Sequence, residues 1–128
     1  MVEFSIIGVL FFVLLIGIVD FGQFLFVQQG IVERARYAAR WGALNDPGDS
    51  TAIQNVVLYM QPTVPTGAVP AFGLTSSNVT VTTADAGTDN YRLMIKISSY
   101  KLTTLSPYLA GSYTGPAINV TVPLGIFN

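Results

Sequence analysis

The sequence contains no cysteine and no histidine. Without cysteine, the chain has neither disulfides nor thiolate metal sites. Without histidine, it lacks the commonest general base and the commonest metal ligand. These two absences exclude serine and cysteine triads and zinc hydrolases of the usual kind. We therefore expect a protein that is not an enzyme and that needs no metal or other cofactor.

Charged residues are also scarce, at 10% of 128 residues, whereas 51% of the residues are hydrophobic. A soluble domain of this size normally has about 25% charged residues. The low charge and a mean hydropathy of +0.54 argue against an ordinary free cytoplasmic monomer. Six Lys and Arg against seven Asp and Glu leave a net charge of -1. This balance gives no basic footprint, so we expect no nucleic acid partner.

The hydrophobic residues are concentrated near the N-terminus. Residues 4–19 and 21–32 contain no charged side chain and are separated only by Asp20. Apolar residues occupy every side of a helix drawn through them, which indicates burial all round. The first run would be about 24 Å long, close to the hydrocarbon core of about 30 Å. A secretory signal peptide would begin with Lys or Arg, where this chain has Glu3. We expect residues 4–32 to act as a membrane anchor.

Helical character continues beyond these runs, because the first proline is Pro47 and residues 33–41 are good helix formers. The sequence predicts one helix from about residue 3 to about residue 43. Its second half is amphipathic, since one face collects four small or apolar residues. These are Ile31, Ala35, Ala38 and Gly42. The chain then divides into a long helix, residues 1–44, and an outer globular domain, residues 45–128.

The globular part begins with turn residues at 45–50, after which Asp49 or Ser50 is expected to cap a short helix. Prolines and glycines make residues 62–73 an irregular connection. Alternating β-branched residues predict strands at 78–83, 91–97 and 117–122, with a hairpin loop at 84–90 between the first two. The predicted fold class is therefore α+β, with a small antiparallel sheet of three or four strands. The face expected to pack in the short helix consists of Ile53, Val56, Val57 and Met60.

Two acidic residues lie in the apolar half of the long helix, where an unpaired carboxylate is costly. Glu3 is either an acid placed at the membrane interface or near the positive end of the helix dipole, or a contact with a positive group on a neighbouring chain. Asp20 either marks where the helix leaves the bilayer or makes a buried contact with an arginine or backbone group of an adjacent subunit. The sequence leaves both pairs of interpretations open.

Three further features have two interpretations each. Arg34, Arg36 and Arg40 are expected either near lipid headgroups or in pairs with acidic residues of another subunit. The aspartates at 46, 49, 85 and 89 do not match a calcium-binding loop and favour turns instead. The triplets at 78–80 and 119–121 fit the N-glycosylation pattern, with Asn78 and Asn119 as acceptors, or are ordinary strand residues.

Three segments carry a family resemblance: Val2, Glu3 and Phe4 at the start of the helix, then residues 17–22, then residues 35–39. Together they resemble the TadE-like pilins of tight-adherence secretion systems, which belong to the wider type IV pilin group. The later strands and residues 105–111 look like the C-terminal half of the same family.

The resemblance implies a prepilin whose leader is removed by a prepilin peptidase and whose helix enters a filament core with the help of the pilus assembly machinery. In such pilins a glutamate usually stands fifth in the mature chain and neutralises a neighbour's N-terminal amine; the matching residue here is Glu3. The helix is expected either to unwind near Gly17 and Gly22 or to stay intact. The residues expected to contact identical subunits are Glu3, Phe4, Phe11, Phe12, Gly17, Asp20, Phe21 and Gly22.

The expected function is that of a structural subunit of an extracellular, cell-surface filament of the type IV pilus kind, serving for example in adhesion. It would be anchored in the inner membrane before assembly. A minor or accessory pilin, which primes or caps a filament built by another subunit, is the main alternative. An enzyme that merely uses the helix as an anchor is disfavoured, because no set of ionisable side chains suggests a catalytic site.

Overall fold

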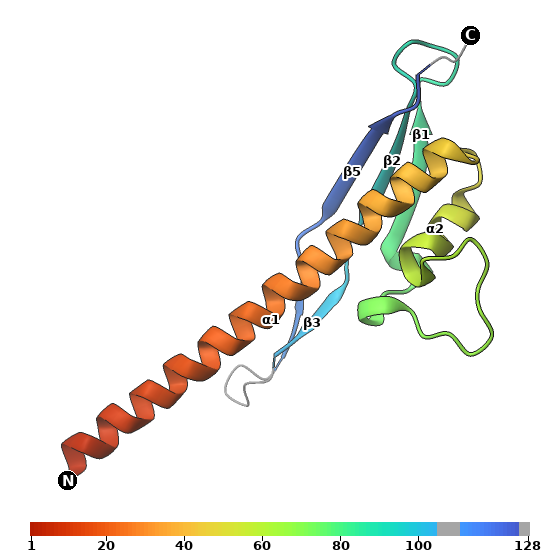
Figure 1. Cartoon of the computed structure of the whole chain (residues 1–128). Helices are drawn as coiled ribbons and strands as arrows, with labels where there is room; N and C mark the ends of the chain where they lie inside the picture. Colours follow the sequence, from red (N-terminus) through yellow and green to blue (C-terminus); the bar gives the residue numbers. More distant parts are fainter. Residues whose placement is uncertain (105–110, 126–128) are drawn as a thin grey trace.

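A computed structural model describes residues 1–104 and 111–125. A long helix, α1 (Val2–Leu44), packs its C-terminal half against the rest of the molecule, and its N-terminal end projects well beyond it (Figure 1). At 1.5 Å per residue its 43 residues span about 65 Å. The helix is continuous through Gly17 and Gly22, so in the single chain the segment between them is not unwound. The predicted helix is therefore confirmed almost to the residue.

Polar side chains cap the end of α1 and hold the turn that follows it. The Asn45 amide Nδ2 donates to the Trp41 carbonyl at 2.9 Å, and the Asp46 carboxylate accepts from the Gly48 amide at 2.8 Å. The second helix, α2 (Ser50–Tyr59), begins at Asp49, whose carboxylate accepts from the Ala52 amide at 2.9 Å. This confirms the predicted N-cap, which satisfies one of the orphan amides of the first turn.

Three strands form the main sheet in the order β1-β2-β5, all antiparallel. They are β1 (Val79–Ala84), β2 (Arg92–Ile97) and β5 (Ile118–Pro123), and each matches a predicted strand to within one or two residues. A separate two-stranded sheet pairs β3 (Lys101–Thr103) with β4 (Ser112–Thr114). The second sheet was not predictable from the sequence, because three-residue strands are too short to produce an alternating pattern. The predicted α+β fold class is confirmed.

The core lies between the main sheet and the C-terminal half of α1, together with α2 (Figure 1). The register aligns Val79, Ile97 and Ile118 across the three strands on the buried face. The predicted packing face of α1 is confirmed, since all four of its residues are buried. At Gly42 an added Cβ would lie 2.7 Å from Ile53 Cδ1 and 3.0 Å from Leu93 Cδ2. Glycine there allows α1, α2 and the sheet to meet closely.

One residue of the α2 face was predicted wrongly. Ile53, Val56 and Val57 are buried, but Met60 is 41% exposed. The helix ends at Tyr59, and Met60 adopts a left-handed conformation with φ 61° as the C-cap. The helical periodicity therefore stops one residue before Met60, and its side chain does not continue the buried face. The connection that follows contains two single-turn 3-10 helices, η1 (Ala71–Gly73) and η2 (Ser76–Asn78).

Candidate assembly surface on the N-terminal helix

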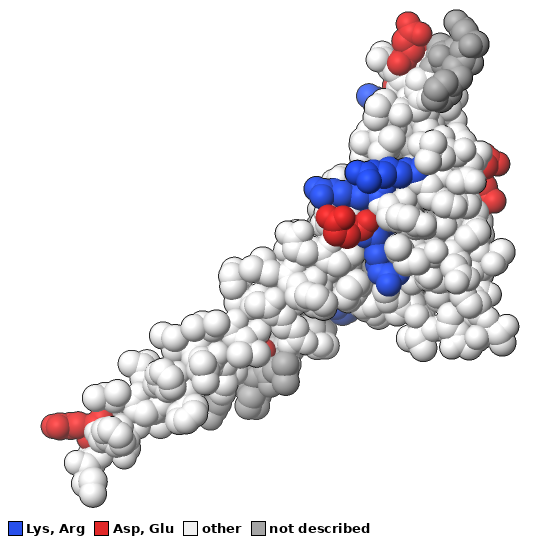
Figure 2. All heavy atoms as spheres, in the orientation of Figure 1, with Lys and Arg blue, Asp and Glu red and all other residues white. Residues whose placement is uncertain are grey.

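The N-terminal half of α1, here called the stem (Val2–Gly22), is apolar on all sides, and Asp20 is the one stem residue that is buried in the part of the chain that the structure describes. The helix is long and apolar enough to span a membrane, and none of its most apolar stretch is buried within the chain. Figure 2 shows this stem as almost free of charge, with acidic atoms at its tip and charged atoms gathered over the other half of the molecule. Phe4, Phe11, Phe12 and Phe21 are all more than half exposed. An apolar surface of this extent marks an interaction site with lipid or protein.

Seven of the eight residues expected in subunit contacts lie on this exposed stem. Glu3 is exposed near the N-terminal tip, and the rings of Phe11 and Phe12 meet edge to face with centroids 5.8 Å apart. An added Cβ at Gly17 or Gly22 would meet nothing within 4 Å, so neither glycine is required by packing within the chain. These seven residues thus lie on the exposed surface of one helical segment, where another molecule can contact them.

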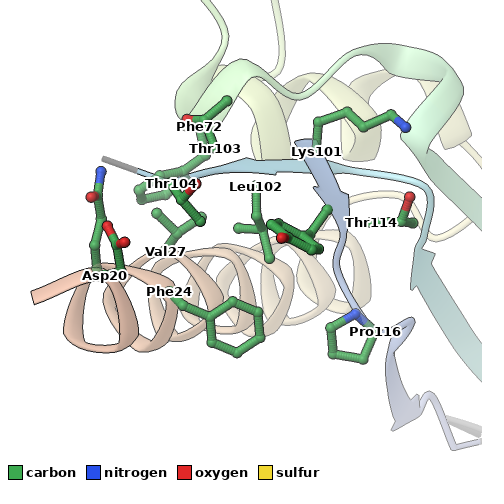
Figure 3. A pocket seen from close by; sticks show the side chains of 12 residues that line it. Asp20, Phe24, Val27, Phe72, Lys101, Leu102, Thr103, Thr104, Thr114 and Pro116 are labelled. Carbon is green, nitrogen blue, oxygen red and sulfur yellow. The ribbon is translucent and has the colours of Figure 1, made fainter. Parts of the chain in front are cut away.

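Asp20 differs from the other seven, because the chain itself covers it. Only 8% of this residue is exposed. It lies at one end of a pocket of about 500 Å³ formed between α1 and the β3–β4 sheet (Figure 3). Phe24 and Val27 continue the α1 wall of this pocket, and Leu102 and Thr104 belong to the opposite wall. The acid in the apolar run is therefore sheltered inside its own chain, which neither interpretation of the sequence considered.

The three arginines have different surroundings. Arg34 is half-buried, and its Nη1 donates to the carbonyls of Val57 and Leu58 at 3.4 Å each. These carbonyls belong to the last turn of α2, where a cation also interacts favourably with the helix dipole. Arg36 pairs with Glu33 on the same helix at 3.1 Å, with both side chains more than half exposed. Arg40 is exposed.

The globular domain has few other charged contacts among the residues that the structure describes. Arg92 and Asp85 form an ion pair at 3.1 Å at the β1–β2 hairpin, both about half exposed. Within residues 1–104 and 111–125, no three acidic side chains come together as a metal site. Asn78 is half-buried, and its amide donates to the Ser98 carbonyl at 3.1 Å. Asn119 is exposed on β5, which leaves it the more accessible of the two glycosylation candidates.

Phe72 holds the long irregular connection against α1, a contact that was not predicted from the sequence. Its ring meets Phe26 edge to face at 6.4 Å between centroids, and the Arg34 guanidinium lies 5.8 Å from the ring centre. Phe72 has a left-handed φ of 55° and no regular pattern around it, so no periodicity could reveal it. The only available signal was a lone aromatic in a segment rich in proline and glycine.

Comparison with known proteins identifies one part of the chain. The family model described as TadE-like protein matches residues 1–40. No curated protein and no solved structure matches the chain. The match confirms the resemblance for the N-terminal helix, which includes all eight expected assembly residues. Residues 105–110, part of the C-terminal segment that also suggested the family, lie outside the described residues.

Proposed function

We propose that this TadE-like chain is a structural pilin subunit, which self-assembles through α1 into an extracellular filament of the type IV pilus kind. The observation that carries the proposal is the exposed apolar stem of α1: among the described residues, none of its most apolar stretch is buried. Before assembly the stem would lie in the inner membrane. Processing by a prepilin peptidase and insertion by an assembly machinery belong to the same proposal.

The shape of the apolar surface favours a polymer over a closed dimer. A single partner helix covers one side of the stem, yet apolar side chains occupy all sides of it. Complete burial outside the membrane therefore needs several neighbours around each stem. Contacts that join one patch of a subunit to a different patch of the next do not close, and they generate helical filaments. The globular domain, attached at one end only, would then form the outer layer (Figure 1).

Leaving the lipid for a helical bundle brings little hydrophobic gain, because lipid chains already surround the apolar side chains. Close packing and polar pairing must supply the difference. Glu3 is the acidic residue near the exposed tip, and burying its carboxylate without a partner would be costly. We assign it the neutralisation of a positive group on a neighbouring subunit. The exposed Arg36 and Arg40 would pair with Asp46 and Asp49 of adjacent copies around the outer layer.

Two variants of Glu3 test the assembly role. Glu3→Ala and Glu3→Gln both remove the negative charge, and Gln keeps the size of the side chain. Both should leave the chain in the membrane and abolish filaments, because the positive partner would stay buried without a counter-charge. Glu33→Gln, on the exposed side of α1, is the matched control and should give normal filaments. Normal filaments from both Glu3 variants would overturn the assignment.

A minor or accessory pilin is the second candidate. The extent of the family match is compatible with it, because the match ends at residue 40 and does not include the globular domain. A minor subunit needs to fit only a partner filament, so its outer domain is free to differ. A major pilin would be the main component of the filament, whereas a minor pilin would be present only in trace amounts.

A further inference from the structure

The exposed apolar part of α1 has nearly the length of a membrane's hydrocarbon core. It extends from Val2 to Val19, immediately before the buried Asp20. At 1.5 Å per residue this stretch spans about 27 Å, against about 30 Å of hydrocarbon. Two exposed rings follow, Phe21 and Phe26, within about 9 Å of Asp20 along the axis. The membrane-spanning part is therefore shorter than the expected residues 4–32, since Ile31 is fully buried in the domain core.

The β3–β4 sheet begins to cover α1 at the level where this apolar stretch ends. Asp20 and Thr104 lie at the same end of the pocket, and β3 continues along the helix past Val27 (Figure 3). Among the described residues, β3 and β4 pair only with each other, so each strand has an open edge. Open edges cannot enter hydrocarbon, because their backbone amides and carbonyls would lose water without gaining partners. The sheet therefore prevents the helix from sinking beyond Asp20.

The exposed side chains of this sheet suit the lipid–water interface. Lys101 is exposed on β3, and Tyr113 on β4 is half exposed. Lysine extends an apolar stem with a charged end that anionic headgroups attract, and tyrosine is enriched at membrane interfaces. Thr103 and Ser112, which pair across the two strands, are small, polar and exposed. Thr103 and Ser112 have no large apolar surface to place in hydrocarbon, and Lys101 and Tyr113 each carry a polar group at the end of an apolar side chain.

The arginines lie too far along α1 to serve as the headgroup contact at this depth. Arg34 follows Asp20 by 14 residues, which places it about 21 Å higher along the axis, and Arg40 lies about 30 Å higher. The headgroup layer on each side of the hydrocarbon is only about 5–8 Å thick. Of the two interpretations of the arginines, the geometry disfavours lipid and favours contacts within the chain or with other subunits.

We infer that the β3–β4 sheet is a membrane collar: it rests on phospholipid headgroups and sets the depth of α1 at Asp20. Here "collar" means Lys101–Thr103 and Ser112–Thr114. The inference depends on the membrane-anchored state that the proposed function includes. The partner is the headgroup layer of a phospholipid bilayer, which the end of the sheet nearest Asp20 would meet first.

Depth-dependent fluorescence quenching tests the collar. The natural sequence has no cysteine, so each single-cysteine variant carries one label. We would label Phe12→Cys, Thr103→Cys and Arg36→Cys with the same environment-sensitive fluorophore. The full chain would be placed in vesicles of phosphatidylethanolamine with a minor share of phosphatidylglycerol. Parallel samples would contain phospholipid with a nitroxide on the headgroup or deep in the acyl chain.

Three results are expected. The label at residue 12 is quenched more strongly by the acyl-chain nitroxide, and the label at residue 103 more strongly by the headgroup nitroxide. The label at residue 36 is quenched by neither. Headgroup quenching at residue 36, or an unquenched label at residue 103, would overturn the collar. If residue 12 is also unquenched, the membrane-anchored state itself fails, which separates the failure of the proposed function from that of the collar.

Discussion

The ring of Phe72 lies directly against the α-carbon of Gly30, so that the long connection after α2 touches α1 where a side chain has no room. A Cβ added at Gly30 would lie 2.8 Å from Cε2 and 3.3 Å from Cε1 of the ring. The same ring contacts Phe26 and Arg34. Phe72 thus joins the irregular connection to α1 between Phe26 and Arg34, beyond the exposed stem.

Gly30→Ala should therefore destabilise the fold. The new methyl group forces the Phe72 ring away from α1, and overpacking of this kind typically costs about 1–3 kcal/mol. The higher helix propensity of alanine offsets up to about 1 kcal/mol of this loss. Gly22→Ala is the matched control, since its added methyl meets nothing and should only gain helix propensity. Denaturant unfolding of the full chain in detergent micelles, followed by the fluorescence of Trp41, compares the two. Equal stability of the two variants would contradict the contact.

Arg34→Met should lower the free energy of unfolding by about 1 kcal/mol, because the carbonyls of Val57 and Leu58 lose their donor. Methionine keeps most of the apolar stem of the side chain. Arg36→Met is the control: it removes only an exposed ion pair to Glu33 and should cost a few tenths of a kcal/mol. The same unfolding assay applies. A larger loss from Arg36→Met than from Arg34→Met would show that Arg34 does not fasten α2.

Titration of Tyr100 should make the free energy of unfolding depend on pH in the alkaline range. Burial raises the pKa of the Tyr100 phenol above its ordinary value of 10.0. Its hydroxyl donates to the Pro116 carbonyl at 3.0 Å, and its ring packs against Gly115. Because the folded state holds the proton more tightly than the unfolded state, this contribution is complete below pH 10 and decreases as the pH rises through the folded pKa.

Unfolding curves at several pH values above 9 would reveal this loss. Tyr100→Phe should be less stable at neutral pH, since the Pro116 carbonyl loses its donor, and should lose less stability than the natural chain as the pH rises. The other tyrosines are present in both proteins, so the difference between the two curves isolates Tyr100. Parallel curves would mean that the phenol titrates equally in the folded and unfolded states.

The regular elements were predictable, because each repeats a pattern along the sequence. The spacing of Ile31, Ala35 and Ala38 marked the buried face of α1, and Asp49 marked the start of α2. The shelter of Asp20 was not predictable, because it depends on β3 and β4, which are three residues long and far away in sequence. Asp20 and the β3–β4 sheet come together only in the folded chain.

The exposed apolar stem was predictable for a different reason. Hydrophobic residues on all sides of the stem can be recognised from the sequence alone, and residues 1–40 match the TadE-like family model. The outer domain lacks such a signal. The contact between Gly30 and Phe72 joins a helix to a segment without periodicity, so neither residue attracted notice.

The central claim is that this chain builds a filament. Negative-stain electron microscopy of material sheared from cells producing it, with mass spectrometry of the same fraction, tests that claim most directly. We expect abundant uniform filaments with this chain as their main component. Filaments composed mainly of another protein, with this chain at trace level or left in the membrane, would contradict the claim and favour the accessory pilin.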